Sequence, residues 1–207
     1  MAIKAVIFDI GNVLIEWQPE RFFDATIGIE KRKTLFATID LHKMNDRIDR
    51  GENWEQVVSE TAKDYPEFSA EILMWHSHWL EMAQPPLDHS LKLLRTLRQK
   101  GTPVFALSNF GVETFAYAEE VYPFLREFDQ RFISGHMQMI KPDAAIYEAV
   151  ETDTKLAPNE MLFADDRIDN IDAAAKRGWH THLFQSPAGW AAVLVEHGLL
   201  TSTEAQS

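Results

Sequence analysis

The feature that most constrains this chain is a largely apolar run from Ala2 to Phe8, which stops abruptly at Asp9. Apolar residues at consecutive positions, rather than at alternate ones, are typical of a strand that is buried on both faces of a parallel sheet. Shorter runs of the same kind occupy residues 102–107, 132–134, 161–164 and 180–184. The sequence therefore predicts buried strands distributed along the chain.

Helical patterns lie between most of these runs. Leu91, Leu94 and Leu97 have the spacing of one helix face within residues 87–100. Two further stretches that we expect to be helical are residues 143–152 and 167–177. Strands that alternate with helices predict an α/β fold, here a Rossmann-like core of three layers whose central parallel sheet is covered by helices on both faces.

The segment after the first run breaks this alternation. Residues 18–83 contain no convincing strand, whereas Trp54, Val57 and Thr61 have the spacing of a helix face. The double proline at residues 85–86 cannot continue a helix and closes the segment. We therefore expect a helical cap inserted after the first strand: the core comprises residues 1–16 and 85–207, and the cap residues 17–84.

Composition narrows the class of protein. With 45% hydrophobic and 25% charged residues, the chain can build a folded core. A formal net charge of −12, with no basic cluster, argues against nucleic acid or an anionic membrane as a partner. No apolar run approaches the roughly 20 residues of a membrane span. The polar tail, residues 201–207, is expected to fray.

The chain has no cysteine, which excludes disulfides, thiolate nucleophiles and cysteine-based metal sites. A reducing compartment fits this composition best, so we expect a cytoplasmic protein. The length of 207 residues suits a monomer or a small homo-oligomer. We expect its partner to be a small molecule.

Polar residues stand directly after three of the predicted strands, and they are Asp9, then Ser108 and Asn109, then Asp165 and Asp166. In open α/β sheets, ligands bind beyond the carboxyl ends of the strands, so these side chains are expected to converge on one crevice. Neighbouring carboxylates raise one another's pKa values unless a cation lies among them, and hard oxygen ligands suit Mg²⁺. The sequence therefore predicts a magnesium site.

Four short motifs in this order carry a family resemblance. They are Phe8-Asp9-Ile10-Gly11-Asn12-Val13-Leu14, Leu107-Ser108-Asn109, Ile140-Lys141-Pro142-Asp143 and Phe163-Ala164-Asp165-Asp166-Arg167-Ile168-Asp169-Asn170. Each motif alone is weak, but all four at successive strand ends, over essentially the whole chain, form a specific pattern. The chain resembles the haloacid dehalogenase-like (HAD) hydrolase superfamily, in the form with a small helical cap.

The resemblance implies a Mg²⁺-dependent phosphatase that acts on a small phosphorylated metabolite. Asp9 would attack phosphorus and form an aspartyl-phosphate. Ser108, the Asn109 backbone N–H and Lys141 would hold the phosphoryl oxygens. The implied metal ligands are Asp9, the backbone carbonyl of Gly11, Asp165, and Asp166 or Asp169 directly or through water.

One position departs from the commonest phosphatase pattern. The residue two after the nucleophile is usually an aspartate that acts as general acid and base, and here it is Gly11. A general acid contributes roughly 10² to 10⁴ in rate, and a better leaving group needs it less. The Asp-x-Gly-Asn-Val form resembles a branch that includes glucose-1-phosphate phosphatases. We therefore expect a sugar phosphate, such as a hexose 1-phosphate, as substrate.

The cap offers two candidate contacts with the substrate. Arg21, at the start of the cap, could reach an anionic or hydroxyl-rich substrate, or it could be an ordinary surface arginine. The second candidate is a cluster of Trp75, His76, His78 and Trp79. On one helix the tryptophans would share a face and the histidines would not, so packing is the favoured interpretation.

Two other functional classes stay open at this point. In a hydrolytic 2-haloacid dehalogenase Asp9 would attack carbon and no metal would be needed, so the acidic fourth motif would lose its purpose. In a non-catalytic phosphate-binding protein the site would bind without turnover, and Gly11 motivates this alternative. His180 and His182 share a strand face, but no third ligand lies near them, so we favour an ordinary strand face over a zinc site.

Overall fold

The computed structural model describes residues 2–206, so the two terminal positions of the predicted core lie outside the described residues. Within them the chain forms a parallel sheet of strand order β3-β2-β1-β4-β5. The strands are β1 (Ala5–Phe8), β2 (Val104–Ser108), β3 (Gln130–Ile133), β4 (Met161–Asp165) and β5 (His180–Leu183). The predicted α/β fold with a central parallel sheet is confirmed.

The first strand holds the centre of the sheet. Val6 pairs with Val104 on one side and with Leu162 on the other. All four residues of β1 and all five of β4 are buried, as expected for strands covered on both faces. The register places the carboxyl ends of β1, β2 and β4 next to one another at the same edge of the sheet.

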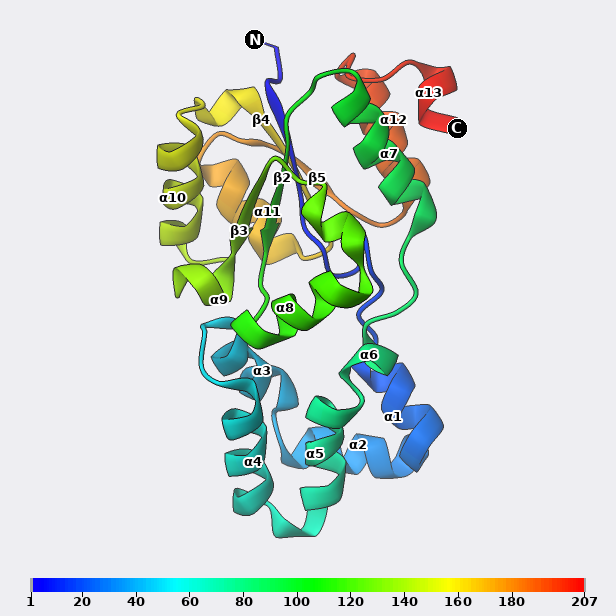
Figure 1. The fold of residues 1–207 in the computed structure, drawn as a ribbon, viewed down its shortest axis with the longest axis vertical. Coiled ribbons are helices and arrows are strands. Elements are labelled where there is room, and N and C mark those ends of the chain that lie inside the picture. Colours follow the sequence, from blue (N-terminus) through cyan, green and yellow to red (C-terminus); the bar gives the residue numbers. More distant parts are fainter. Residues whose placement is uncertain (1, 207) are drawn as a thin grey trace.

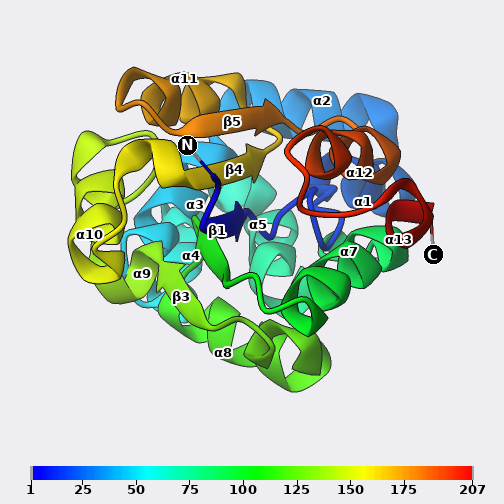
Figure 2. The same ribbon diagram turned by 90° about the horizontal axis from the view of Figure 1, so that it is seen from above.

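Helices cover both faces of the sheet (Figure 2). On one face α10 (Ala144–Thr154) and α11 (Ile168–Lys176) pack on Ile7 and Phe163. On the other face α7 (Asp88–Gln99), α8 (Val112–Val121) and α12 (Pro187–Glu196) pack around Phe8. The remaining core helices are η2 (Pro123–Arg126), α9 (Ser134–Met137), η3 (Pro158–Glu160) and α13 (Ser202–Gln206).

The segment predicted to form a cap is helical and lies below the sheet in Figure 1. Asp40 and Asn53 begin α3 and α4 by accepting hydrogen bonds from backbone N–H groups three residues on. The elements of this segment are α1 (Pro19–Ile27), α2 (Ile29–Thr38), α3 (Leu41–Asp49), α4 (Trp54–Asp64), η1 (Pro66–Phe68), α5 (Ser69–Ser77) and α6 (Trp79–Met82).

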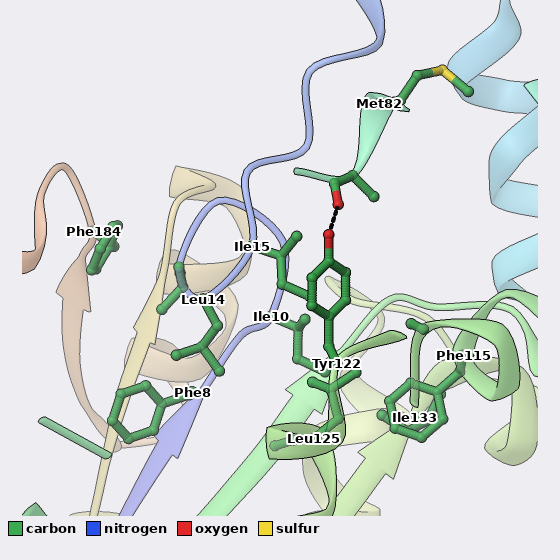
Figure 3. Close-up of a cluster of buried hydrophobic side chains, with 14 of the residues drawn as sticks. Phe8, Ile10, Leu14, Ile15, Met82, Phe115, Tyr122, Leu125, Ile133 and Phe184 are labelled. Atoms are coloured by element: carbon green, nitrogen blue, oxygen red, sulfur yellow. Dashed lines mark hydrogen bonds between the residues drawn. The ribbon is translucent and has the colours of Figure 1, made fainter. Parts of the chain in front are cut away.

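Two connecting segments join the cap to the core and run side by side. The backbone N–H of Glu16 donates to Pro85 O (3.0 Å), and that of Leu87 donates to Leu14 O (2.8 Å). Tyr122 secures this junction from the core, because its buried hydroxyl donates to Ala83 O at 2.7 Å (Figure 3).

Several predicted boundaries were wrong. The first strand begins at Ala5 rather than Ala2, and β3 begins at Gln130, two residues before the predicted run. The tail expected to fray instead forms α13, whose Ala205 is buried and accepts a hydrogen bond from His89. Among residues 2–206, no helix is both long and apolar enough to cross a membrane.

Candidate active site

The candidate site lies where β1, β2 and β4 end. Asp9 follows β1 directly, while Ser108 and Asp165 are the last residues of their strands. These three side chains are almost fully withdrawn from solvent, with exposed fractions of 7%, 2% and 0%. The convergence that the sequence predicts at this edge of the sheet therefore exists.

Lys141 joins these strand ends although it comes from the loop before α10. Its Nζ lies 2.6 Å from Asp165 Oδ2 and 3.0 Å from Asp9 Oδ1, and it donates to Leu107 O at 2.8 Å. Asn109 fixes the loop, because its side chain donates to Lys141 O (2.9 Å) and accepts from Lys141 N (2.8 Å). An ammonium group is thereby held between two buried carboxyls.

The electrostatics of this cluster follow from burial and charge. Burial alone would lower the pKa of Lys141. The negative charges and hydrogen bonds of Asp165 and Asp9 outweigh the effect of burial, so the pKa of Lys141 is raised. Burial raises the pKa of Asp9 to about 7, against the opposing effects of Lys141 and of a hydrogen bond with Ser108. Asp165 and Asp166 add to the rise because they are like charges.

A third carboxyl, that of Asp166, completes an acidic group. Carboxylate oxygens of Asp9, Asp165 and Asp166 lie within 4.8 Å of one another. Three convergent hard oxygens suit an Mg²⁺-sized cation better than a zinc ion, and burial, aided by the neighbouring carboxyls, raises the pKa values of Asp9 and Asp166. The donor set therefore fits the predicted metal.

Two asparagines orient these carboxyls. Asn170 Nδ2 donates to both oxygens of Asp165 (2.9 and 3.0 Å), and Asn12 Nδ2 donates to Asp166 Oδ2 (2.9 Å). Sequence reasoning assigned neither of them a role, although both lie inside the motifs that carry the family resemblance. In the sequence, each asparagine is only an amide residue near an aspartate motif. That pattern does not distinguish a residue that orients a metal ligand from one that caps a helix.

Two predicted residues do not join the cluster. Asp169 is turned to Arg167, with which it forms an exposed ion pair at 2.9 Å, and it lies outside the acidic group. The Arg21 guanidinium is held by Glu16 (2.6 Å) and by Gln84 O (2.7 Å), and of these two partners Glu16 lines the cavity whereas Arg21 itself does not. In both cases a partner close by already satisfies the charged group: the Arg167 guanidinium for Asp169, and a carboxylate and a carbonyl for Arg21.

The cluster forms one wall of a cavity that reaches up to the cap. The core contributes Asp9 and Asp166 of the acidic group, together with Gly11, Ser108, Asn109 and Lys141. The cap side of the lining includes Trp17, Asn45, Asp46, Asp49 and Trp79. The sequence carried no signal for Asn45, Asp46 or Asp49, since only the packing of α3 on the core brings them there.

The aromatic cluster of the cap is mainly packing, as predicted, although α5 ends before Trp79 and the four residues do not share one helix. Trp75 is fully buried against Trp17, whereas Trp79 both packs and lines the cavity. His76 contacts the Trp54 ring and His78 the Phe22 ring, on separate sides. Among the described residues, no metal-ligand group includes these histidines, His180 or His182.

Curated relatives align with most of this chain. A drimenol cyclase, drtB, of Aspergillus calidoustus is 29% identical over 88% of the chain, but the match spans only 34% of the cyclase. A sesquiterpene phosphatase, astK, of Aspergillus oryzae is 26% identical over 84% of the chain and 86% of that protein. A D-ribitol-5-phosphate phosphatase of Bacteroides thetaiotaomicron is 24% identical over 91% and 95%.

Solved structures share the fold. A HAD-family enzyme of Bacteroides thetaiotaomicron, in a complex with magnesium and inorganic phosphate, superposes with a TM-score of 0.70 at 23% identity and covers 89% of this chain and 96% of its own. A family model described as haloacid dehalogenase-like hydrolase matches residues 3–178. The chain therefore belongs to the haloacid dehalogenase-like hydrolase family.

Proposed function

We propose that this protein is a Mg²⁺-dependent phosphatase that hydrolyses a small phosphorylated metabolite. The observation that carries the proposal is the buried ammonium of Lys141 between Asp9 and Asp165, with the Asp166 carboxyl beside them. This arrangement combines a nucleophilic carboxylate with the positive charge that a phosphoryl group requires. Two of the curated relatives described above are named as phosphatases, which supports the same reaction class.

Each residue of the site has a defined task in this reaction. Asp9 attacks phosphorus, so that the ester bond breaks and an aspartyl-phosphate forms, and water then hydrolyses that intermediate. The Ser108 hydroxyl, the Asn109 backbone N–H and Lys141 Nζ bind the phosphoryl oxygens, since the Asn109 side chain is already engaged by the Lys141 backbone.

The magnesium ion would be held by Asp9, Asp165, Asp166 and the backbone carbonyl of Gly11. When bound, it supplies the charge that neutralises the nucleophile and the phosphoryl oxygens. Asn170 and Asn12 keep the Asp165 and Asp166 carboxyls in position for it.

The lining of the cavity supports a hydroxyl-rich leaving group, such as that of a hexose 1-phosphate. Asn45 and Asp46 offer hydrogen-bonding groups, while the rings of Trp17 and Trp79 offer apolar faces beside them. Such a pairing suits a sugar ring, which has both C–H faces and hydroxyls. We assign no substrate contact to Arg21, because Glu16 and Gln84 O already hold its guanidinium and Arg21 does not itself line the cavity.

The dehalogenase alternative is less well supported. Attack on carbon needs no metal. Asp165 and Asp166 would then have no ligand, and their like charges would repel one another and Asp9. Asn12 and Asn170 would orient carboxyls that had no ligand. These contacts favour phosphoryl transfer.

Phosphate release from a panel of sugar phosphates and one aryl phosphate tests the proposal. We expect turnover with added Mg²⁺ and loss of turnover, by at least about a hundredfold, with excess chelator, because the cation neutralises the transferring group. Release that is indifferent to chelator would contradict the metal assignment. Chloride release from a 2-haloacid, without phosphate release from any ester, would favour the dehalogenase.

The binding of Mg²⁺ is expected to depend on pH. The folded protein keeps the Asp9 proton up to about pH 7, so this group lowers the free energy of unfolding progressively as the pH rises from about 4 to 7. The cation needs the carboxylate form, and its affinity should therefore fall by about tenfold for each pH unit below 7. Measuring the Mg²⁺-induced rise in Tm at pH 6 and pH 8 checks this.

The matched variants for this measurement are Asp165→Asn and Asp169→Asn. The first should abolish the rise in Tm, and the second should leave it intact because Asp169 pairs with Arg167 outside the acidic group. An equal rise at both pH values, or a loss with Asp169→Asn, would contradict the proposed ligand set.

A further inference from the structure

The cap places one buried carboxyl over the crevice, that of Asp49 at the end of α3. Its exposed fraction is only 8%, and it lines the same cavity as Asp9, Ser108 and Lys141. The core side of the cavity lacks a carboxyl at position 11, where Gly11 stands. The site as proposed therefore has a nucleophile and charge neutralisation but no group on the core that delivers a proton to the leaving oxygen.

The backbone of Asp49 is fixed to the core. Ser134 Oγ donates to Asp49 O at 2.6 Å and accepts from Phe110 N at 2.8 Å, so one hydroxyl links the cap to the loop that follows β2. A Cβ added at Gly111 would lie 2.6 Å from Ile48 Cγ2. Only a residue without a side chain allows α3 to approach this closely.

The turn after Asp49 shows the same tight contact. Gly51 has a φ of +98°, and a Cβ there would lie 2.6 Å from Gly135 O. Arg50 adds an ion pair with Asp143 at 3.1 Å. The cap segment from Ile48 to Gly51 is thus packed against the core in one defined position. The Asp49 side chain is therefore held at a defined place in the cavity.

Only one oxygen of the Asp49 carboxyl accepts a hydrogen bond from the described part of the chain. Asn45 Nδ2 donates to Asp49 Oδ2 at 2.8 Å, and within residues 2–206 no hydrogen bond joins the other oxygen to the protein. Burial, with a further contribution from the like charges of Asp46 and Asp9, raises the pKa of Asp49 to about 8, against smaller opposing effects of Asn45 and Lys141. At neutral pH the Asp49 carboxyl therefore carries a proton, and one of its oxygens is available to a bound substrate.

We propose that Asp49 is the general acid and base of this site, and that it does from the cap what a carboxyl at position 11 would do from the core. The inference rests on the proposed phosphatase function and adds the residue that moves the proton. Because the acid belongs to the cap, the proposed catalytic residues are all in place only when the cap is packed against the core.

The proposed reaction has two steps, and Asp49 gives up a proton in the first and regains one in the second. Asp9 attacks phosphorus, the bond from phosphorus to the leaving oxygen breaks with its electron pair on that oxygen, and the Asp49 proton is transferred to it to give the alcohol. The Asp49 carboxylate then takes a proton from the water that attacks the aspartyl-phosphate. The electron pair of the broken bond returns to Asp9, and inorganic phosphate leaves.

Other titratable groups of the cap fit this role less well. Asp46 is exposed and is influenced by Arg167 and Arg50. His42 lines the cavity too, but it is half-exposed and its Nε2 contacts Glu20 at 3.1 Å. Asp49 alone among these three is buried.

The decisive experiment measures leaving-group release in a single turnover by Asp49→Asn, with an alkyl phosphate and with p-nitrophenyl phosphate. A nitrophenolate leaves without a proton, whereas an alkoxide does not. We expect the rate for the alkyl phosphate to fall by about 10² to 10⁴, while the rate for the aryl phosphate changes little. Equal losses for both substrates, or no loss for either, would overturn the proposal.

Two companion variants separate catalysis from structure. Asp64→Asn makes the same change at an exposed cap position outside the cavity and should leave the ratio of the two rates unchanged. Gly11→Asp, added to Asp49→Asn, should restore the alkyl rate selectively, since a Cβ at Gly11 meets only Trp17 Cβ, at an ordinary 3.9 Å. An alkyl rate that stays as low in the double variant would count against the shared role.

Failure of the underlying function would look different. The unaltered protein would then release neither leaving group, and Asp9→Asn would change nothing. If the unaltered protein is active and Asp9→Asn is not, the ratio of rates in Asp49→Asn reports on the general acid alone. Thermal unfolding of each variant confirms that the comparison is made between folded proteins.

Discussion

Asp9→Asn is expected to abolish phosphate release, with a fall of about 10⁴-fold or more, because a neutral amide oxygen cannot form the aspartyl-phosphate. The side chain has nearly the same shape and can still accept the backbone N–H of Ile10, which now donates to Asp9 Oδ1 at 2.8 Å. Removal of a carboxyl whose pKa burial has raised also relieves repulsion with Asp165. Steady-state phosphate release measures the effect.

The variant is therefore expected to stay folded, with a Tm equal to or above that of the unaltered protein in chelator. This outcome distinguishes a lost nucleophile from a lost fold. Turnover that survives Asp9→Asn with every substrate would show that the assignment of the nucleophile is wrong.

Lys141→Met should have the largest effect on stability. It removes the ammonium between Asp9 and Asp165, with Lys141 itself only 2% exposed. Breaking a buried pair by removing one partner costs about 3–5 kcal/mol, because the remaining charge has neither water nor a counter-ion. We expect a loss of this size in the free energy of unfolding of the metal-free protein, together with loss of activity.

The loss should grow as the pH rises above 7, since Asp9 loses the opposing effect of Lys141 and holds its proton to still higher pH. Denaturant unfolding in chelator, at pH 6 and pH 8, measures it. Lys4→Met is the matched control, because the Lys4 side chain is 60% exposed in its ion pair with Glu160 and the pair should contribute no more than about 1 kcal/mol. Equal effects of the two substitutions would refute the argument.

The sequence predicted the core well because its strands are encoded locally. Each residue of β1 is fully buried, so an unbroken apolar run was a sufficient signal, and the polar residue after it marked the ligand-binding edge. The boundaries of β3 were harder to predict, since Gln130 and Arg131 join the sheet while only half-buried or exposed. Pairing with β2, rather than local composition, places them there.

The site was predicted in part for a similar reason. Residues at strand ends share an edge whatever the loops do, so Asp9, Ser108 and Asp165 meet. Asp169 and Arg21 depend on side-chain direction, and in both cases a local partner decides that direction. No sequence pattern indicated Asp49, since its proposed role depends on the packing of α3 against Gly111, a contact between residues far apart in the chain.

The Ser134 hydroxyl joins two events that are otherwise separate. It connects Phe110, which follows the proposed phosphate ligands Ser108 and Asn109, to the cap backbone at Asp49. A phosphate that orders this loop therefore also stabilises the seated cap, and the two equilibria share a coupling free energy that must act equally in both directions. A substitution that loosens the cap would weaken phosphate affinity without touching any phosphate ligand.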